Sequence, residues 1–194
     1  YSRGIKTVDE ALKAGVMSGQ QLVGARHWRD LEQRIPRSEV CEIVGSVRRA
    51  LDAVLIAGGV NPEDVSRAAD AIGAGSYRRG MPSSGDVDVL ITRRDGGPDS
   101  GLISAVLEQL QNLGCEVDHL THEEEVQSHG LANATRTASC QSYRGVIRLP
   151  GEGRLFRRLD VKVYPVEEFA YALLYFTGSD HFNRSMRHFA KQRG

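Results

Sequence analysis

Two aspartates one residue apart, Asp86 and Asp88, are the residues of this chain best suited to chemistry. Side chains alternate along a β-strand, so this spacing directs both carboxylates to one face of a sheet while Val87 and Val89 pack on the other. Two ionised carboxylates held close together repel each other unless a cation neutralises them, and oxygen ligands of this kind suit Mg²⁺. The pair therefore predicts a divalent metal site on a strand.

A phosphate-binding turn is predicted ten residues before the aspartates, where residues 75–80 read Gly-Ser-Tyr-Arg-Arg-Gly. A Gly-Ser turn offers backbone N–H groups and a hydroxyl to phosphate oxygens, and a guanidinium group binds phosphate through two parallel hydrogen bonds. Metal ligands beside phosphate ligands indicate chemistry on a nucleotide.

A third aspartate, Asp160, occupies a later strand pattern together with Arg158 and Lys162 on one face, while the residues between them are apolar. If this strand lies beside the strand of Asp86, three carboxylates converge and can hold two divalent ions. An Asp-x-Asp pair alone is common on surface strands, so the specificity comes from the combination of all three features.

The elements that must position these residues follow from apolar periodicity and from caps. Thr7 and Ser18 each begin a capping box, Pro36 stops the second helix, and Ser100 can cap a later one. Helices are expected over about 7–15, 18–36, 38–58, from 61, 100–114, 166–176 and 179–191. Strands are expected up to Gly75 and over about 86–92, 115–120, 143–149 and 154–164, and polar residues 121–142 are expected to form a long mobile loop.

Composition limits the classes of protein that remain. Net charge is zero, yet 21 of the 25 basic residues are arginine, and acids and bases are segregated along the chain. Three widely spaced cysteines, Cys41, Cys115 and Cys140, indicate reduced thiols rather than disulfides or a zinc site. No apolar stretch approaches the ~20 residues of a membrane span, so a soluble protein without a membrane partner is expected.

The motifs described above, together with Tyr-Phe-Thr-Gly-Ser at 175–179, resemble the family X DNA polymerases across nearly the whole chain. The resemblance implies an α+β fold: a nucleotidyltransferase (polymerase β-like) palm with a mixed sheet and flanking helices, plus an N-terminal helical segment. It divides the chain into a DNA-binding helical part (1–37), a catalytic palm (38–165) and the start of a nucleotide-binding subdomain (166–194).

The activity that the resemblance implies is template-directed addition of deoxynucleotides (dNTP) to a primer in gapped or primer-template DNA, in base excision repair and end joining. The catalytic residues would be Asp86, Asp88 and Asp160, binding two Mg²⁺ ions, with Mn²⁺ as an alternative. The residues matching those that bind nucleotide are Arg37, Ser76, Arg79, Gly85, Tyr175, Phe176, Gly178 and Asn183. Those matching DNA-binding positions are Arg158, Arg184 and Arg187. A nuclear location and repair-protein partners, docking on regions outside this chain, are further implications.

Two departures from the family pattern leave alternatives open. Against the family pattern the sequence is expected to be a fragment or a truncated form, without the lyase domain and the rest of the nucleotide-binding subdomain, so a catalytically inactive DNA- or nucleotide-binding fragment is the first alternative. The segment 121–142 approaches the length found in template-independent relatives, which makes a terminal transferase the second. The Tyr175–Phe176 pair, however, matches the template-dependent members.

Overall fold

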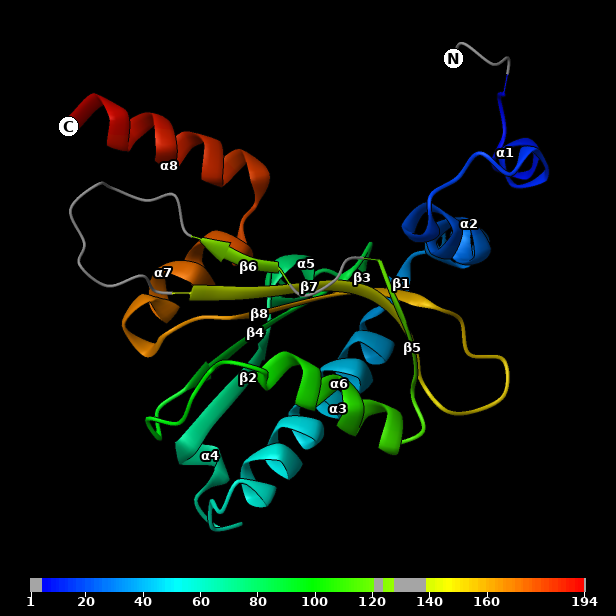
Figure 1. The fold of residues 1–194 in the computed structure, drawn as a ribbon. Helices are drawn as coiled ribbons and strands as arrows, with labels where there is room; N and C mark the ends of the chain where they lie inside the picture. Colours follow the sequence, from blue (N-terminus) through cyan, green and yellow to red (C-terminus); the bar gives the residue numbers. More distant parts are fainter. Residues whose placement is uncertain (1–4, 121–123, 128–138, 194) are drawn as a thin grey trace.

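A mixed β-sheet covered on one face by two helices forms the body of the molecule in the computed structural model, which describes residues 5–120, 124–127 and 139–193 (Figure 1). The strand order is β2-β4-β8-β7-β5, with β6 pairing with β7. The strands are β2 (Ala69–Gly73), β4 (Val87–Arg93), β5 (Glu116–His119), β6 (Glu124–Gln127), β7 (Ser139–Arg148) and β8 (Arg157–Val163). Among the described strands of this sheet, β4 and β8 pair in parallel, and the other pairs are antiparallel. This confirms the α+β class.

Two small helices precede the sheet. Helix α1 (Val8–Ala14) starts at Thr7, whose side chain accepts the Glu10 N–H, and ends at Gly15 in the left-handed region. Helix α2 (Gly19–Leu31) has the complete capping box at Ser18 that the sequence predicts. It ends five residues before Pro36, because Ile35–Pro36 form strand β1, which pairs with β3 (Ser83–Ser84). The predicted extension of this helix to Pro36 is therefore wrong.

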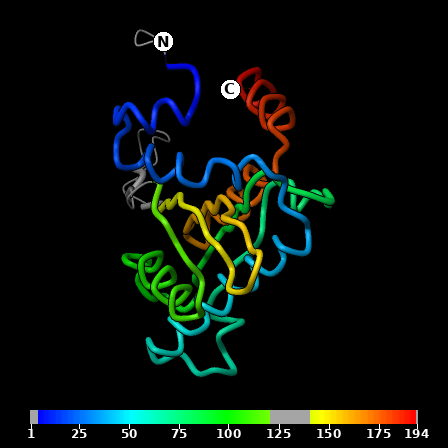
Figure 2. The backbone as a smooth tube through the Cα atoms, turned by 90° about the vertical axis from the view of Figure 1, so that its right-hand side faces the viewer, coloured from blue at the N-terminus to red at the C-terminus, as the bar shows by residue number. Residues whose placement is uncertain are grey.

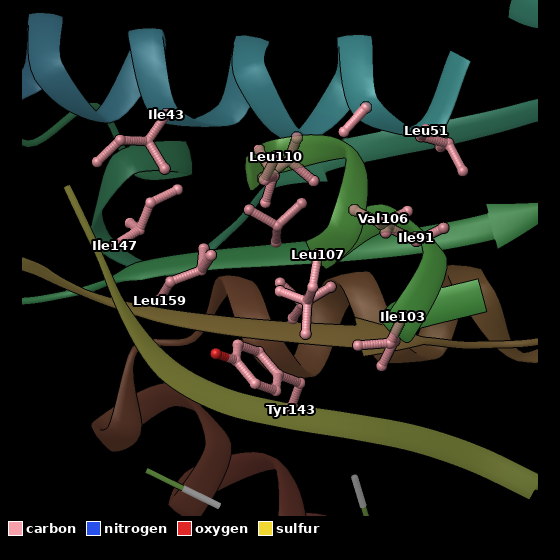
Figure 3. Close-up of a cluster of buried hydrophobic side chains, with 14 of the residues drawn as sticks. Ile43, Leu51, Ile91, Ile103, Val106, Leu107, Leu110, Tyr143, Ile147 and Leu159 are labelled. Atoms are coloured by element: carbon pink, nitrogen blue, oxygen red, sulfur yellow. The ribbon is translucent and has the colours of Figure 1, made fainter. Parts of the chain in front are cut away.

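The core lies between the sheet and helices α3 (Arg37–Ala57) and α6 (Leu102–Asn112) (Figure 3). The apolar stripe of α3, including Ile43 and Leu51, meets Val106 and Leu110 of α6 over the inward side chains of β4 and β8. Burial of such side chains stabilises the fold by about 1.5–3 kcal/mol each. The stripe that periodicity predicts for residues 38–58 is thus core packing.

The opposite face of the sheet carries the polar side chains of β4 and β8, because alternate residues point to opposite sides. Helix α7 (Val166–Thr177) packs its Phe169 and Ala172 on Leu90 at one end of this face. Helix α8 (Asp180–Arg193) then projects away, and no residue of α8 is buried. Both views place α1–α2 and α8 on the same side of the sheet (Figures 1 and 2).

Two short helices complete the described elements: α4 (Val65–Ala68) and α5 (Gly75–Arg78). The short helix predicted to start at Asn61-Pro62 begins three residues after Pro62, at Val65. Ser100 is not a cap, because α6 starts after Gly101, which adopts φ +72°. Glycine adopts the left-handed conformation more easily than other residues, so Gly101 rather than Ser100 directly precedes the helix.

The expectation of one long loop over 121–142 is also wrong in part. Residues 124–127 form β6, and β7 already begins at Ser139, so the two strands pair with each other. Polar strands of this kind have no apolar alternation and gain their regularity from backbone pairing, which local sequence does not reveal. Residues 121–123 and 128–138 of the predicted loop lie outside the described part of the chain.

Cys41 and Cys115 are free thiols, as predicted, while the side chain of Cys140 lies outside the description. In the part of the chain that the structure describes, no helix combines the length and the apolar character that crossing a bilayer requires.

Candidate active site

Parallel pairing of β4 with β8 brings the predicted aspartates together. Asp88 lies directly opposite Asp160 in the register, and Asp86 immediately precedes β4. Residues paired across neighbouring strands share a face and lie about 5 Å apart, so the two carboxylates meet on the polar face of the sheet. The strand of Asp160 therefore lies beside the strand that follows Asp86, which is the arrangement that convergence of the three carboxylates requires.

The electrostatics of these carboxylates favour the binding of a cation. Burial, followed by the negative charges of Asp86 and Asp160, raises the pKa of Asp88 from 3.8 to about 6. Burial also raises the pKa of Asp160. Asp160 Oδ1 is buried and has no hydrogen-bond partner within the described residues. Acceptor-only oxygens that are desolvated and unsatisfied suit a hard divalent cation, so the residues fit Mg²⁺.

Three basic side chains stand around the carboxylates. Arg158 forms an ion pair with Asp86, and Arg144 Nε lies 3.8 Å from Asp160 Oδ2. Lys162, next on the same face of β8, donates to Ser142 Oγ at 2.7 Å. Within the described ranges, no three acidic, cysteine or histidine side chains are already arranged as a metal cage. The acidic cluster is thus partly neutralised by the chain's own arginines.

The predicted phosphate-binding turn forms helix α5 and packs directly against Asp88. Gly75 has φ +55°, and a Cβ there would collide with the Asp88 carboxylate, so only glycine allows this approach. Ser76 Oγ donates to Ser84 Oγ at 2.8 Å, which positions the hydroxyl at the start of α5. The turn and the carboxylates therefore form one continuous surface.

The corner between α7 and α8 closes the site from the other side. Arg79 Nη1 donates to the Thr177 carbonyl at 2.6 Å, and Gly178 follows with φ +69°. Asn183 Nδ2 donates to the Tyr175 carbonyl at 2.8 Å. The ring of Phe176 packs near Tyr164, with 6.0 Å between centroids. Backbone carbonyls of this corner thus hold two of the predicted nucleotide-binding side chains.

A pocket of about 490 Å³ lies between these elements and is large enough for a small ligand. Its lining contains ten of the fourteen predicted site residues: Ser76, Arg79, Gly85, Asp86, Asp88, Tyr175, Phe176, Gly178, Asn183 and Arg187.

Four predicted residues lie outside the lining of this pocket. Asp160 and Arg158 belong to the adjoining carboxylate cluster. Arg37 donates to the Tyr77 carbonyl at 2.6 Å and stacks 4.3 Å from the Tyr77 ring centroid, so it braces the α5 turn from outside. Arg184 pairs with Asp180 at 3.0 Å on the exposed side of α8.

Four lining residues were not among the predicted site residues: Arg34, Gly75, Met81 and Asp180. Arg34 reaches the site because β1 pairs with β3, and its Nη2 donates to the Ser83 carbonyl at 2.7 Å. A pairing of two-residue strands has no periodic signal in sequence. Gly75 could have been predicted as a site residue, since it is the first glycine of the predicted phosphate-binding turn.

The comparisons with known proteins agree with this geometry. Residues 34–166 match the DNA polymerase beta palm model, and residues 172–194 match the DNA polymerase beta thumb model. The chain is 40% identical over its full length to DNA polymerase lambda of Rattus norvegicus and 30% identical to DNA polymerase lambda of Arabidopsis thaliana. It is 28% identical, over 99% of its length, to the human DNA-directed DNA/RNA polymerase mu.

The sequences of segments 145–151 and 181–187 predict a likeness to DNA polymerase lambda and indicate a plant source. The likeness to lambda is confirmed, and a plant protein is among the relatives that match over the whole chain. The chain spans 30%, 33% and 40% of the lengths of the rat, Arabidopsis and human relatives. The palm match alone covers more than half of the chain and includes all three aspartates. The chain therefore belongs to the family X DNA polymerases.

Proposed function

We propose that this chain is the catalytic part of a template-directed DNA polymerase that fills short gaps in DNA. One observation carries the proposal: Asp88 and Asp160 pair across β4 and β8, directly beside a pocket lined by Ser76 and Arg79. The reaction is attack of a primer 3′-hydroxyl on the α-phosphate of a deoxynucleoside triphosphate, with pyrophosphate as the leaving group.

Asp86, Asp88 and Asp160 would hold two divalent cations, for which Mg²⁺ is the best fit and Mn²⁺ the alternative. Bound here, such ions supply charge neutralisation and activation of the hydroxyl. Arg158, which forms an ion pair with Asp86, would lie beside the primer end, where its guanidinium group is suited to the negative charge of the phosphates.

The chain's own groups orient the nucleotide. The Ser76 hydroxyl and the Arg79 guanidinium face the pocket and are suited to the triphosphate. Tyr175 and Phe176, at the end of α7, would pack on the sugar, where a 2′-hydroxyl would clash. Asn183 would contact the base, with Arg187 near the template. Holding the reactants in this way accounts for much of the rate of phosphoryl transfer.

The proposal assigns residues 1–37 to DNA binding, 38–165 to catalysis and 166–194 to nucleotide binding. Base excision repair and end joining are the processes that need such short synthesis, and they place the protein in the nucleus with repair proteins as partners. The palm match supports the catalytic part of this division, and the names of the relatives and the segregated arginines support action on DNA.

The test is primer extension on gapped DNA by the full-length protein with Asp160→Ala. Extension is expected to be lost while the thermal unfolding transition stays cooperative, because Asp160 contributes to catalysis and is not part of the hydrophobic core. Asp64→Ala, at an exposed aspartate beside α4, is the matched control and should leave extension unchanged. Undiminished extension by Asp160→Ala would refute the proposal.

Primer extension, together with measured binding of DNA and nucleotide, distinguishes the two alternative functions. Extension of a single-stranded primer without template indicates a terminal transferase. Binding of DNA and nucleotide with no turnover in Mg²⁺ or Mn²⁺ indicates a binding module.

A further inference from the structure

The N-terminal helices have almost no core of their own. Helix α1 has no buried residue, and Ala25 is the buried residue of α2. Apolar burial is the main force that holds helices in place, and because so little of it is present here, individual side-chain contacts contribute much of what places α2 on the palm.

One group of side chains makes that contact. The imidazole of His27 stacks on the ring of Phe156 with 3.8 Å between centroids, and His27 Nε2 lies 2.8 Å from Asp118 Oδ2. One turn further along α2, Asp30 Oδ2 accepts the backbone N–H of Phe156 at 3.0 Å. These four residues, called the His27 clasp below, join α2 to the end of β5 and to the segment that leads into β8.

The palm side of the clasp is itself held in place. The Arg148 guanidinium lies 4.8 Å from the centroid of the Phe156 ring and forms an ion pair with Glu116. The His27 side chain is 13% exposed and Asp118 is 43% exposed, so their hydrogen bond lies at the rim of the contact. Removing it should loosen α2 without exposing the core beneath the sheet.

The position of α2 matters for the face that carries the aspartates. Helices α2 and α8 lie on the same side of the sheet, above that face (Figures 1 and 2). The chain leaves α2 at Leu31 and reaches Arg34, which lines the pocket, three residues later. A shift of α2 is therefore transmitted over a very short distance to the edge of the site.

We infer that His27, Asp118 and Phe156 are positioning residues that set where the N-terminal helical segment lies on the palm, and through it how tightly the polymerase holds DNA. The inference rests on the proposed function for its effect on DNA, whereas the contact itself can be tested without catalysis. It predicts an effect on the KM for gapped DNA and little effect on kcat, because none of the three residues reaches the carboxylates.

The first measurement uses the single tryptophan of the 194-residue chain, Trp28, which is adjacent to His27 on α2. His27→Ala should shift Trp28 emission to longer wavelength, because Trp28 is half-buried and loosening of α2 should bring more water to its indole. His27→Phe keeps the ring stack, and His27→Gln keeps an N–H donor at similar reach, so each should shift emission less. Gln20→Ala, at an exposed position of the same helix, is the matched control.

The second measurement is steady-state gap filling by the full-length protein. A hydrogen bond to a charged group contributes enough that His27→Ala should raise the KM for gapped DNA about tenfold, with kcat changed by less than about twofold. Asp118→Ala should give a smaller increase, because it leaves the stack of His27 on Phe156, and the double variant should be no worse than His27→Ala, because that variant already removes the contact with Asp118.

Unchanged Trp28 emission together with an unchanged KM in His27→Ala would overturn the inference, and so would a loss confined to kcat. If even the unmodified protein fills no gaps, the proposed function fails instead, and the emission of Trp28 still decides whether the clasp positions α2.

Discussion

Replacing Asp88 by Asn should stabilise the protein in the absence of divalent cations. The two side chains have nearly the same shape, but asparagine cannot ionise. Burial and the charges of Asp86 and Asp160 raise the pKa of Asp88 from 3.8 to about 6. Each tenfold difference in proton affinity corresponds to about 1.4 kcal/mol, so ionised Asp88 destabilises the folded state by about 3 kcal/mol.

The pH dependence follows from the direction of this pKa. Below about pH 4, Asp88 is protonated in both the folded and the unfolded state, and the variant and the unmodified protein should be equally stable. Between about pH 4 and 6 the folded state binds the proton more tightly, so the stability of the unmodified protein falls as pH rises. At pH 7.5 the free energy of unfolding should therefore be about 3 kcal/mol higher for Asp88→Asn.

The assay is thermal or urea unfolding in EDTA at pH 4.5, 6 and 7.5, repeated at pH 7.5 with Mg²⁺. For a chain of this size, 3 kcal/mol corresponds to a Tm difference of about 6–12 °C. Added Mg²⁺ should stabilise the unmodified protein more than the variant, because the variant has one ligand charge fewer. Asp64→Asn, at an exposed site, is the control for loss of a charge anywhere on the surface. Parallel stability curves for Asp88→Asn and the unmodified protein across this pH range would refute the reasoning.

Two further predictions concern the scaffold of the site. Glu39→Gln should lower the free energy of unfolding by about 3–5 kcal/mol in urea unfolding, because Glu39 accepts two hydrogen bonds from buried Arg157, at 2.8 and 2.9 Å, and its loss leaves that cation unpaired. Glu42→Gln, which breaks an exposed ion pair one turn further along α3, should cost less than about 1 kcal/mol; equal losses would contradict the argument from burial. Gly145→Ala should lower the Tm, at a cost of about 1–3 kcal/mol, because a Cβ there collides with the hydroxyl of buried Tyr143 and lies 2.7 Å from a backbone carbonyl of β5. An unchanged Tm would show that β7 relaxes freely.

Local patterns were sufficient for most elements because they depend on neighbouring residues. The capping box at Ser18, the apolar stripe of the helix after Pro36 and the alternation around Asp88 all act within a few residues, and the structure contains each of them. Boundaries were less certain. Gly101, not Ser100, flanks α6, and it adopts the left-handed backbone conformation that glycine favours.

The candidate metal-binding residues were also chosen from sequence, since three acidic side chains on apolar strands have few structural reasons to exist. Their mutual arrangement did not. Asp88 and Asp160 are 72 positions apart, and only the parallel pairing of β4 with β8 places them opposite each other. The same holds for Arg34, brought to the pocket by β1 and β3, and for the stacking of His27 on Phe156.

The sequence by itself determined which groups are available for chemistry and which face of each strand they occupy, because those properties follow from residue type and from the two-residue period. Tertiary structure decided which of them meet, how far their charges shift one another's pKa, and which arginines stand in the field of the acids. Those quantities depend on distances and burial, and distances between strands come from long-range pairing that no local pattern encodes.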